Sequence, residues 1–252
     1  MQNMIISVSI LGFKRLELQN NLRIERSELF MAKENKGERI KRWNLYLVTE
    51  EELSAGRKTI DIVREAIAGG VKIIQLRDKN LPVIDRYRLG KEIREITLKH
   101  DVDFIVNDRI DLAMALDADG VHLGQEDLPL RVARKILGPE KIIGISASNI
   151  EEAKAAETGG ADYLGVGSIY LTGSKKVGED RRSIGAEGVA AIKRECPLPI
   201  IAIGGLKREN CQTIIQAGAD AIAVITALTQ APDVAREARE FVKIIQRVKE
   251  GK

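Results

Sequence analysis

The segment Val71-Lys-Ile-Ile74-Gln75-Leu-Arg77-Asp-Lys79 joins a short apolar run directly to a cluster of polar side chains. The same succession recurs where Phe104-Ile-Val106 precedes Asn107-Asp108-Arg109, and where Gly120-Val121 precedes His122-Leu-Gly-Gln125-Glu-Asp127. Short β-branched runs bounded by turn residues are typical of buried strands. The polar residues are therefore predicted at the C-terminal ends of strands, where parallel α/β folds bind their ligands.

Short apolar runs alternate with longer amphipathic stretches from Asn44 onward. Eight runs are present: Leu45 to Val48, Ile73 to Leu76, Phe104 to Val106, Gly120 to His122, Ile142 to Ile145, Tyr163 to Val166, Ile200 to Ile203, and Ala221 to Val224. This alternation indicates βα units and a parallel sheet. Eight such units predict an α/β fold, a (βα)8 TIM barrel, over residues 43–252.

A weak repeat stands between the helical patterns and several strands. Its copies are Asp117-Ala-Asp-Gly120, Gly160-Ala-Asp-Tyr163 and Gly218-Ala-Asp-Ala221. Glycine just past a helix end supplies the left-handed cap that returns the chain to the sheet. We expect this repeat at the N-terminal end of the barrel, which serves stability rather than ligand binding.

Residues 1–42 lack this rhythm and carry nine basic and five acidic side chains, a net charge of +4. They are predicted to be a charged N-terminal extension that either packs as a strand and helix or is poorly ordered. Subtracting them from the whole chain (40 − 9 basic, 37 − 5 acidic) leaves the body at −1, which argues against nucleic-acid binding.

The compartment follows from the cysteines and from one apolar segment. Cys196 and Cys211 lack metal-ligand spacing and the cysteine density of a secreted scaffold, which favours a reducing cytoplasm. The apolar stretch from Met4 to Phe13 is too short to span a bilayer. We therefore expect a cytoplasmic protein without a membrane partner.

Gln75, Arg77 and Lys79 alternate along one strand end, so their side chains face the same side. If that side is the barrel mouth, an amide, a guanidinium and an ammonium converge on one anion. The alternative is a solvated charge run that merely ends a strand.

Asp108 and Asp127 are candidate Mg²⁺ ligands on adjacent loops, with Asn107 beside them. Mg²⁺ binds a few carboxylate oxygens together with substrate phosphate and water, so two aspartates suffice. Asp127 could instead cap a helix that starts at Leu128-Pro129. His122 is interpreted as a packed barrel residue rather than a base.

Two further groups suit a phosphate ligand. The long loop after the sixth strand carries Thr172, Ser174 and Lys175, whose hydroxyls and ammonium can surround a phosphoryl group unless the loop is simply polar and flexible. Gly204-Gly205 after the seventh strand and Ile225-Thr226 after the eighth occupy the usual phosphate site of such barrels.

Together these residues resemble the thiamine phosphate synthase family over residues 43–245. The motifs that carry the resemblance are Leu45-Tyr-Leu-Val-Thr49, Gln75-Leu-Arg-Asp-Lys79, Asn107-Asp108-Arg109, Gly120-Val-His-Leu-Gly-Gln-Glu-Asp127, Gly144-Ile-Ser146, Thr172-Gly-Ser-Lys175 and Ala202-Ile-Gly-Gly205. The resemblance implies a transferase that joins two small molecules, hydroxymethylpyrimidine diphosphate and thiazole phosphate, into thiamine phosphate and pyrophosphate with Mg²⁺.

The resemblance also assigns roles. It implies that Gln75, Arg77, Lys79 and Asn107 hold the pyrimidine diphosphate, and that Asp108 and Asp127 bind Mg²⁺. Ser146 would face the reacting centre, and Lys175 would reach the departing pyrophosphate. Thr172, Ser174, Gly205, Ile225 and Thr226 would hold the thiazole phosphate.

The chain departs from the family pattern at two places. The loop Gly167-Ser-Ile-Tyr-Leu-Thr-Gly-Ser-Lys175 lacks two prolines usual in the family, and Ser148 stands where a histidine is often found. A TenI-like thiazole tautomerase would need that histidine, and a non-catalytic phosphate-ligand sensor would not need Asp108, Asp127 and Lys79 together. Both alternatives are therefore weaker, and association into a homo-oligomer stays open.

Overall fold

The computed structural model describes residues 35–171 and 183–251. The chain divides after Arg39 into two units, and the second, Ile40–Lys252, contains the barrel. Ile40 and Trp43 are buried in the interior of this second unit. Residues 1–34, most of the extension expected from the sequence, lie outside the described residues.

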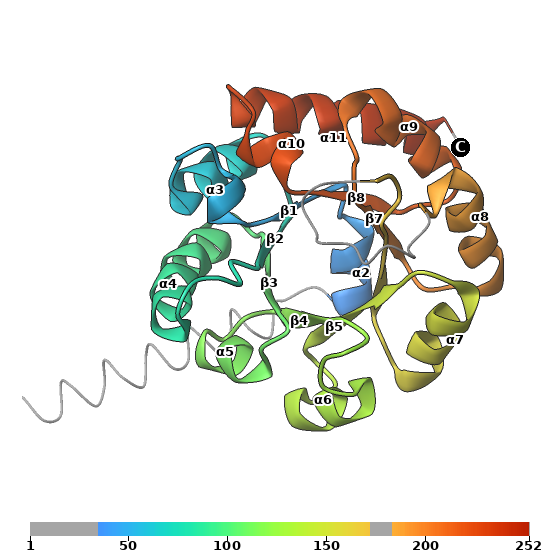
Figure 1. Ribbon diagram of the computed structural model, residues 1–252, viewed down its shortest axis with the longest axis horizontal. Coiled ribbons are helices and arrows are strands. Elements are labelled where there is room, and N and C mark those ends of the chain that lie inside the picture. Colours follow the sequence, from blue (N-terminus) through green and yellow to red (C-terminus); the bar gives the residue numbers. More distant parts are fainter. Residues whose placement is uncertain (1–34, 172–182, 252) are drawn as a thin grey trace, which may run out of the picture. The chain divides into compact units, whose positions relative to one another are not determined.

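Eight parallel strands close into a barrel in chain order, and β8 pairs with β1 (Figure 1). The strands are β1 (Leu45–Val48), β2 (Ile73–Leu76), β3 (Asp103–Asn107), β4 (Gly120–Leu123), β5 (Ile142–Ala147), β6 (Tyr163–Val166), β7 (Ile200–Ile203) and β8 (Ala221–Val224). The predicted (βα)8 barrel is confirmed, and each strand lies on one of the eight apolar runs.

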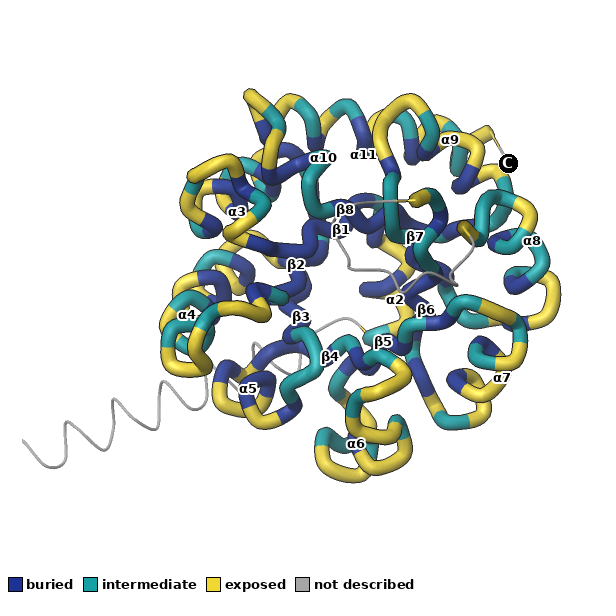
Figure 2. Tube along the Cα trace, in the orientation of Figure 1, coloured by how far each residue is buried: buried dark blue, intermediate teal, exposed yellow. Residues whose placement is uncertain are grey.

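From Thr59 onward, helices surround the barrel, with exposed outer faces and buried inner faces (Figure 2). The helices are α2 (Lys36–Lys41), η1 (Glu51–Leu53), α3 (Thr59–Ala68), α4 (Val83–Lys99), α5 (Ile110–Ala115), α6 (Leu130–Leu137), α7 (Ile150–Gly159), α8 (Gly185–Glu195), α9 (Arg208–Gln216), α10 (Thr226–Thr229) and α11 (Val234–Glu250). No helix in the described part of the chain is both long and apolar enough to cross a membrane.

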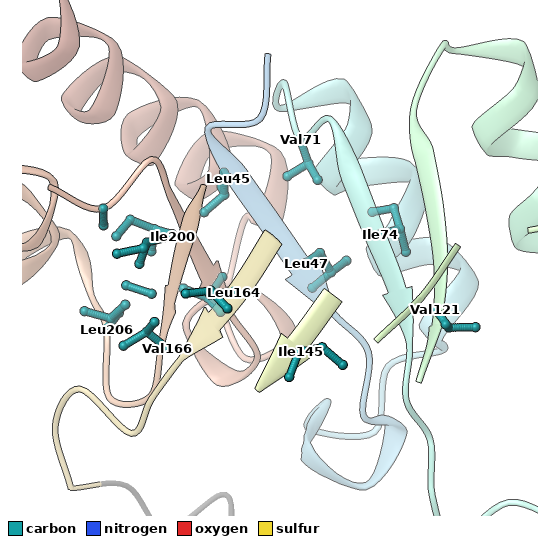
Figure 3. Packing of buried hydrophobic residues seen from close by; sticks show 14 of the residues in the cluster. Leu45, Leu47, Val71, Ile74, Val121, Ile145, Leu164, Val166, Ile200 and Leu206 are labelled. Carbon is teal, nitrogen blue, oxygen red and sulfur yellow. The ribbon is translucent and has the colours of Figure 1, made fainter. Parts of the chain in front are cut away.

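The residues on the two faces of the barrel sheet belong to two separate hydrophobic clusters. Leu45 and Leu47 of β1 point toward the helix layer and join the larger cluster shown in Figure 3. Tyr46 and Val48, the alternate residues, join a smaller cluster inside the barrel. Burial on both faces explains why the strands read as continuous apolar runs.

The Ala-Asp repeat lies at the N-terminal end of the barrel, as the sequence predicts. The Asp162 carboxylate accepts hydrogen bonds from the Ile143 backbone N–H at 2.8 Å and from the Arg134 guanidinium at 2.6 Å. Asp119 and Asp220 repeat this arrangement: Asp119 with Phe104 N–H and Arg94, Asp220 with Ile200 N–H and Lys193. Each aspartate thus ties the start of one strand to the preceding strand and to a helix.

Candidate active site

Two adjoining cavities open at the C-terminal ends of the strands. The central cavity, about 530 Å³, is lined by residues from all eight strands and from the adjoining loops. The β7–β8 cavity, about 710 Å³, is lined by the loops after β7 and β8. Ser168, Ile203, Ala223 and Ile225 line both cavities, so ligands held in the two would lie next to each other.

The predicted site residues divide between these cavities. Those that line the central cavity are Gln75, Arg77, Lys79, Asn107, Asp108, Asp127, Ser146 and Ile225. Those that line the β7–β8 cavity are Gly205, Ile225 and Thr226. The remaining predictions, Thr172, Ser174 and Lys175, fall outside the described residues.

Arg77 is held by a partner that the sequence reasoning missed. Its Nη1 pairs with the Glu50 carboxylate, and the side chains are only 14% and 10% exposed. Burial raises the pKa of Glu50, although the Arg77 charge opposes that rise. Glu50 follows β1 by two residues, so the rule that polar residues matter just after apolar runs could have identified it.

The loops after β1 and β2 are fastened together by a buried aspartate. Asp78 accepts hydrogen bonds from the Thr49 hydroxyl and from the Glu51 backbone N–H. The Thr49 hydroxyl in turn accepts from the Arg77 backbone N–H at 3.1 Å. These contacts fix the backbone that presents the Arg77 guanidinium to the central cavity.

Lys79 and the two candidate metal ligands lie together. The Lys79 ammonium is 2.7 Å from Oδ2 of Asp108, whose backbone takes a left-handed conformation with φ of +61°. Burial raises the pKa of Asp127, and the nearby Asp108 carboxylate raises it further. An adjacent carboxylate that raises the pKa of Asp127 suits a site for a divalent cation, whose charge would relieve the repulsion.

Asp127 is not a helix cap. Helix α6 begins at Leu130 with Pro129 at its N-cap and no side-chain cap bond. The Asp127 Oδ2 instead accepts from the Gly124 backbone N–H at 2.6 Å, which folds the loop after β4 around the carboxylate. In the part of the chain that the structure describes, no group of three or more His, Cys, Asp or Glu side chains forms a metal cage. A metal here would rely on the two aspartates plus ligand and water, as Mg²⁺ does.

His122 is packed, as expected, but it also lines the central cavity. Its Nδ1 is 3.0 Å from the Tyr163 hydroxyl, and its Nε2 is 3.0 Å from the Ser146 hydroxyl. The ring lies over Gly165, where an added Cβ would be 2.6 Å from the His122 Cε1. A barrel histidine that contacts Ser146 belongs to the site even though it is partly buried.

Ser148 lies at the rim of the central cavity and is hydrogen-bonded to Glu152. Its backbone N–H and its hydroxyl both donate to the Glu152 carboxylate, at 2.7 Å and 2.9 Å. Glu152 lines the central cavity beside Ser148 and was not predicted from the sequence. The sequence feature that could have identified Glu152 is its position in the first turn of α7, shortly after the strand that carries Ser146.

Glycines shape the β7–β8 cavity. Gly204 and Gly205 have φ of +106° and +65°. An added Cβ would lie 2.8 Å from the Ser168 Cα at Gly204 and 2.8 Å from the Tyr170 Cβ at Gly205. The loops after β6 and β7 are therefore in close contact, and only glycine fits both the backbone conformation and the space.

Comparison with known proteins gives a consistent family match. A family model described as thiamine monophosphate synthase matches residues 45–228. A thiamine-phosphate synthase of Moorella thermoacetica is 51% identical over 207 residues, covering 82% of this chain and 98% of the relative. One of Haloarcula marismortui is 50% identical over 205 residues, covering 81% of this chain and 97% of the relative.

A solved structure agrees with these sequence matches. The thiamine phosphate pyrophosphorylase of Pyrococcus furiosus superposes with a TM-score of 0.76 at 42% identity. The match covers 83% of this chain and 98% of the other. The described barrel therefore corresponds to nearly the whole of that protein.

Proposed function

Since the chain belongs to the thiamine monophosphate synthase family and catalyses the formation of thiamine phosphate, we propose that it does so by joining hydroxymethylpyrimidine diphosphate to thiazole phosphate across its two cavities. One observation carries this proposal: the cations Arg77 and Lys79 and the carboxylates Asp108 and Asp127 line one cavity, which adjoins a glycine-lined second cavity. Two substrates that each carry phosphate need such a pair of neighbouring sites.

The diphosphate binds in the central cavity. Arg77 and Lys79 supply positive charge, while Gln75 and Asn107 supply amide groups that orient the ligand. Asp108 and Asp127 would hold Mg²⁺, which when bound supplies positive charge to the departing pyrophosphate. Lys175, from the loop after β6, is proposed to reach the same pyrophosphate.

The thiazole phosphate binds in the β7–β8 cavity. The backbone after Gly205 and the start of α10 at Thr226 offer N–H groups, and Ile225 lines both cavities. Thr172 and Ser174, which lie outside the described residues, are proposed to help hold the phosphate. Because the two cavities share lining residues, a thiazole bound in one would have its nitrogen beside a pyrimidine bound in the other.

The bond-breaking step needs charge stabilisation more than a base. The aminopyrimidine ring stabilises a methylene cation as the C–O bond breaks, so the barrier lies in the charge that builds on pyrophosphate. Each well-placed donor in a water-excluded site contributes a few kcal/mol, so Arg77 and Lys79 account for a large part of the acceleration. The thiazole nitrogen then attacks the cation, with Ser146 beside the reacting centre, and this step requires positioning only.

The tautomerase alternative is not favoured, because Ser148 replaces the histidine that it needs and donates both its hydrogen bonds to Glu152. We propose a cytoplasmic enzyme of small-molecule substrates, without nucleic-acid or membrane partners. The near-neutral charge of residues 43–252 supports the lack of a nucleic-acid partner.

The test is thiamine phosphate formation by purified protein given both substrates, with Mg²⁺ or with EDTA. Metal-dependent product is expected from the wild type and from a control variant, Asp61→Ala, which removes a carboxylate exposed on α3. Asp127→Ala is expected to give no product. Equal product with and without EDTA would contradict the role of Mg²⁺, and no product from folded wild type would contradict the proposed reaction.

A further inference from the structure

Five side chains form a continuous hydrogen-bond chain across the barrel interior. Gln75 Nε2 donates to the Tyr46 hydroxyl at 2.7 Å, and the Tyr46 and Tyr163 hydroxyls are 3.2 Å apart. The Tyr163 hydroxyl is 3.0 Å from His122 Nδ1, and His122 Nε2 is 3.0 Å from the Ser146 hydroxyl. The chain begins and ends at residues that line the central cavity.

The middle of the chain is buried and closely packed. The Tyr46 and Tyr163 side chains are almost fully buried, and the Trp43 ring packs edge-on against Tyr163 at 5.2 Å between ring centres. An added Cβ at Gly144 would lie 2.1 Å from the Tyr163 Cζ, so this glycine makes room for the phenol ring. Packing therefore holds the hydroxyls in place with little freedom to find other partners.

The hydrogen bonds of this chain all point the same way, because each hydroxyl carries only one proton to donate. Burial raises the pKa of both tyrosines well above the ordinary value, so both remain neutral phenols. The Gln75 NH₂ group can only donate, so the Tyr46 proton points to the Tyr163 oxygen. The Tyr163 proton then points to His122 Nδ1, which must be unprotonated to accept it.

We propose that this hydrogen-bond chain fixes His122 as the neutral Nε2–H tautomer and makes Ser146 a hydrogen-bond donor to the substrate. This proposal rests on the function proposed above. His122 Nε2–H donates to the Ser146 oxygen, which leaves the Ser146 hydroxyl proton directed into the central cavity. Tyr46, Tyr163 and His122 are then positioning residues that act through Ser146. A ring nitrogen of the pyrimidine or a phosphate oxygen would accept that proton.

The opposite polarity is a defined alternative. If Gln75 presented its carbonyl oxygen, the Tyr46 proton would point to it and every proton in the chain would shift by one place. His122 would then carry its proton on Nδ1, and the Ser146 proton would point to His122 instead of the cavity. The state of His122 therefore reports the polarity of the whole chain.

The first experiment reads that state in the ligand-free wild type by ¹⁵N NMR of histidine-labelled protein. The protein has only two histidines, and the exposed His100 serves as the internal reference. A neutral His122 with its proton on Nε2 is expected. A proton on Nδ1, or an imidazolium, would overturn the proposal whether or not the protein makes thiamine phosphate.

The second experiment reverses the direction of the hydrogen bonds by a substitution at Gln75, the end of the hydrogen-bond chain opposite Ser146. Gln75→Glu replaces a donor by a carboxylate that only accepts, so the His122 proton is expected to move to Nδ1. The matched control is Gln75→Glu in a Tyr46→Phe background, where the chain is cut and the proton should stay on Nε2. An identical shift in both backgrounds would show that the tyrosines do not carry the effect.

The third experiment measures catalysis with the tyrosine ring retained. Tyr163→Phe removes the donor to His122 and is expected to mix its tautomers and to lower kcat/KM about 3- to 10-fold, the equivalent of one hydrogen bond. The control is Tyr87→Phe, which removes a hydroxyl from a partly buried ring on α4. It should leave the His122 tautomer and kcat/KM unchanged. A mixed tautomer with unchanged kcat/KM would refute the action on Ser146.

Discussion

Arg77→Ala separates two roles of one guanidinium, binding of diphosphate charge and neutralisation of Glu50. Both side chains are nearly buried and paired with each other, and Arg77 lines the central cavity. Loss of a donor aimed at developing charge in a water-excluded site costs about 2.7 to 4 kcal/mol, or roughly 10² to 10³ in kcat/KM. The same variant leaves the Glu50 carboxylate without Arg77, which should destabilise the fold by about 1 to 3 kcal/mol.

The double variant Glu50→Gln/Arg77→Ala distinguishes these effects. A neutral amide at Glu50 needs no cation, so the double variant should recover most of the lost free energy of unfolding, measured in urea. It should recover none of the lost kcat/KM, measured from initial rates of thiamine phosphate formation. Recovery of activity together with stability would show that Arg77 acts only through the fold, and our assignment of the diphosphate site would be wrong.

The stability loss should also depend on pH. Burial already holds the pKa of Glu50 above its ordinary value, and Arg77 is the main group that lowers it. Its removal raises that pKa further, and a carboxyl with a raised folded-state pKa loses stability as pH rises through that value. The destabilisation by Arg77→Ala should therefore be larger at about pH 8 than at about pH 5, and no such difference is expected in the double variant.

Four further outcomes are expected. Asp127→Ala should abolish Mg²⁺-dependent synthesis while the far-ultraviolet circular dichroism stays that of the wild type; retained activity would exclude it as a metal ligand. Deleting residues 1–34 should leave kcat/KM unchanged, and a folded but inactive truncation would show that this segment contributes to the site. Asp162→Ala should lower the free energy of unfolding by about 1.5 to 3 kcal/mol, because its carboxylate accepts from a charged group; a loss below about 0.5 kcal/mol would contradict that. Burial raises the pKa of the Cys211 thiol to about 11, so it should react with a disulfide reagent at pH 8 far more slowly in the native protein than in urea, and equal rates would refute its burial.

The strands could be predicted closely because their signal is local. The bounds of β1, β2, β6, β7 and β8 coincide with the predicted runs. Strands of a parallel barrel are buried on both faces, so the runs are mostly apolar, and only Gln75 in β2 and His122 in β4 interrupt them. The strands β3 and β5 extend beyond their predicted runs into polar residues such as Asn107 and Ser146, because ladder pairing continues past the last apolar side chain.

The position of the candidate site could also be predicted, but the partners of its side chains could not. Strand order along the chain places the residues after β2, β3 and β4 at one rim, and this required no tertiary information. That Arg77 pairs with Glu50 depends on how the loops after β1 and β2 fold together around Asp78. The helix-cap interpretation of Asp127 failed for a related reason, because the carboxylate turns back to its own loop.

The sequence by itself therefore determined the barrel, its eight strands and the set of chemical groups at its C-terminal rim, because hydrophobic periodicity and strand-end position are properties of neighbouring residues. Only the tertiary structure decided which groups are coupled. Tyr46 and Tyr163 are 117 positions apart, and their hydroxyls meet because barrel closure brings β1 and β6 to face each other across an interior opened by Gly144. A contact of that kind depends on closure of the whole sheet, and no local pattern in the chain encodes it.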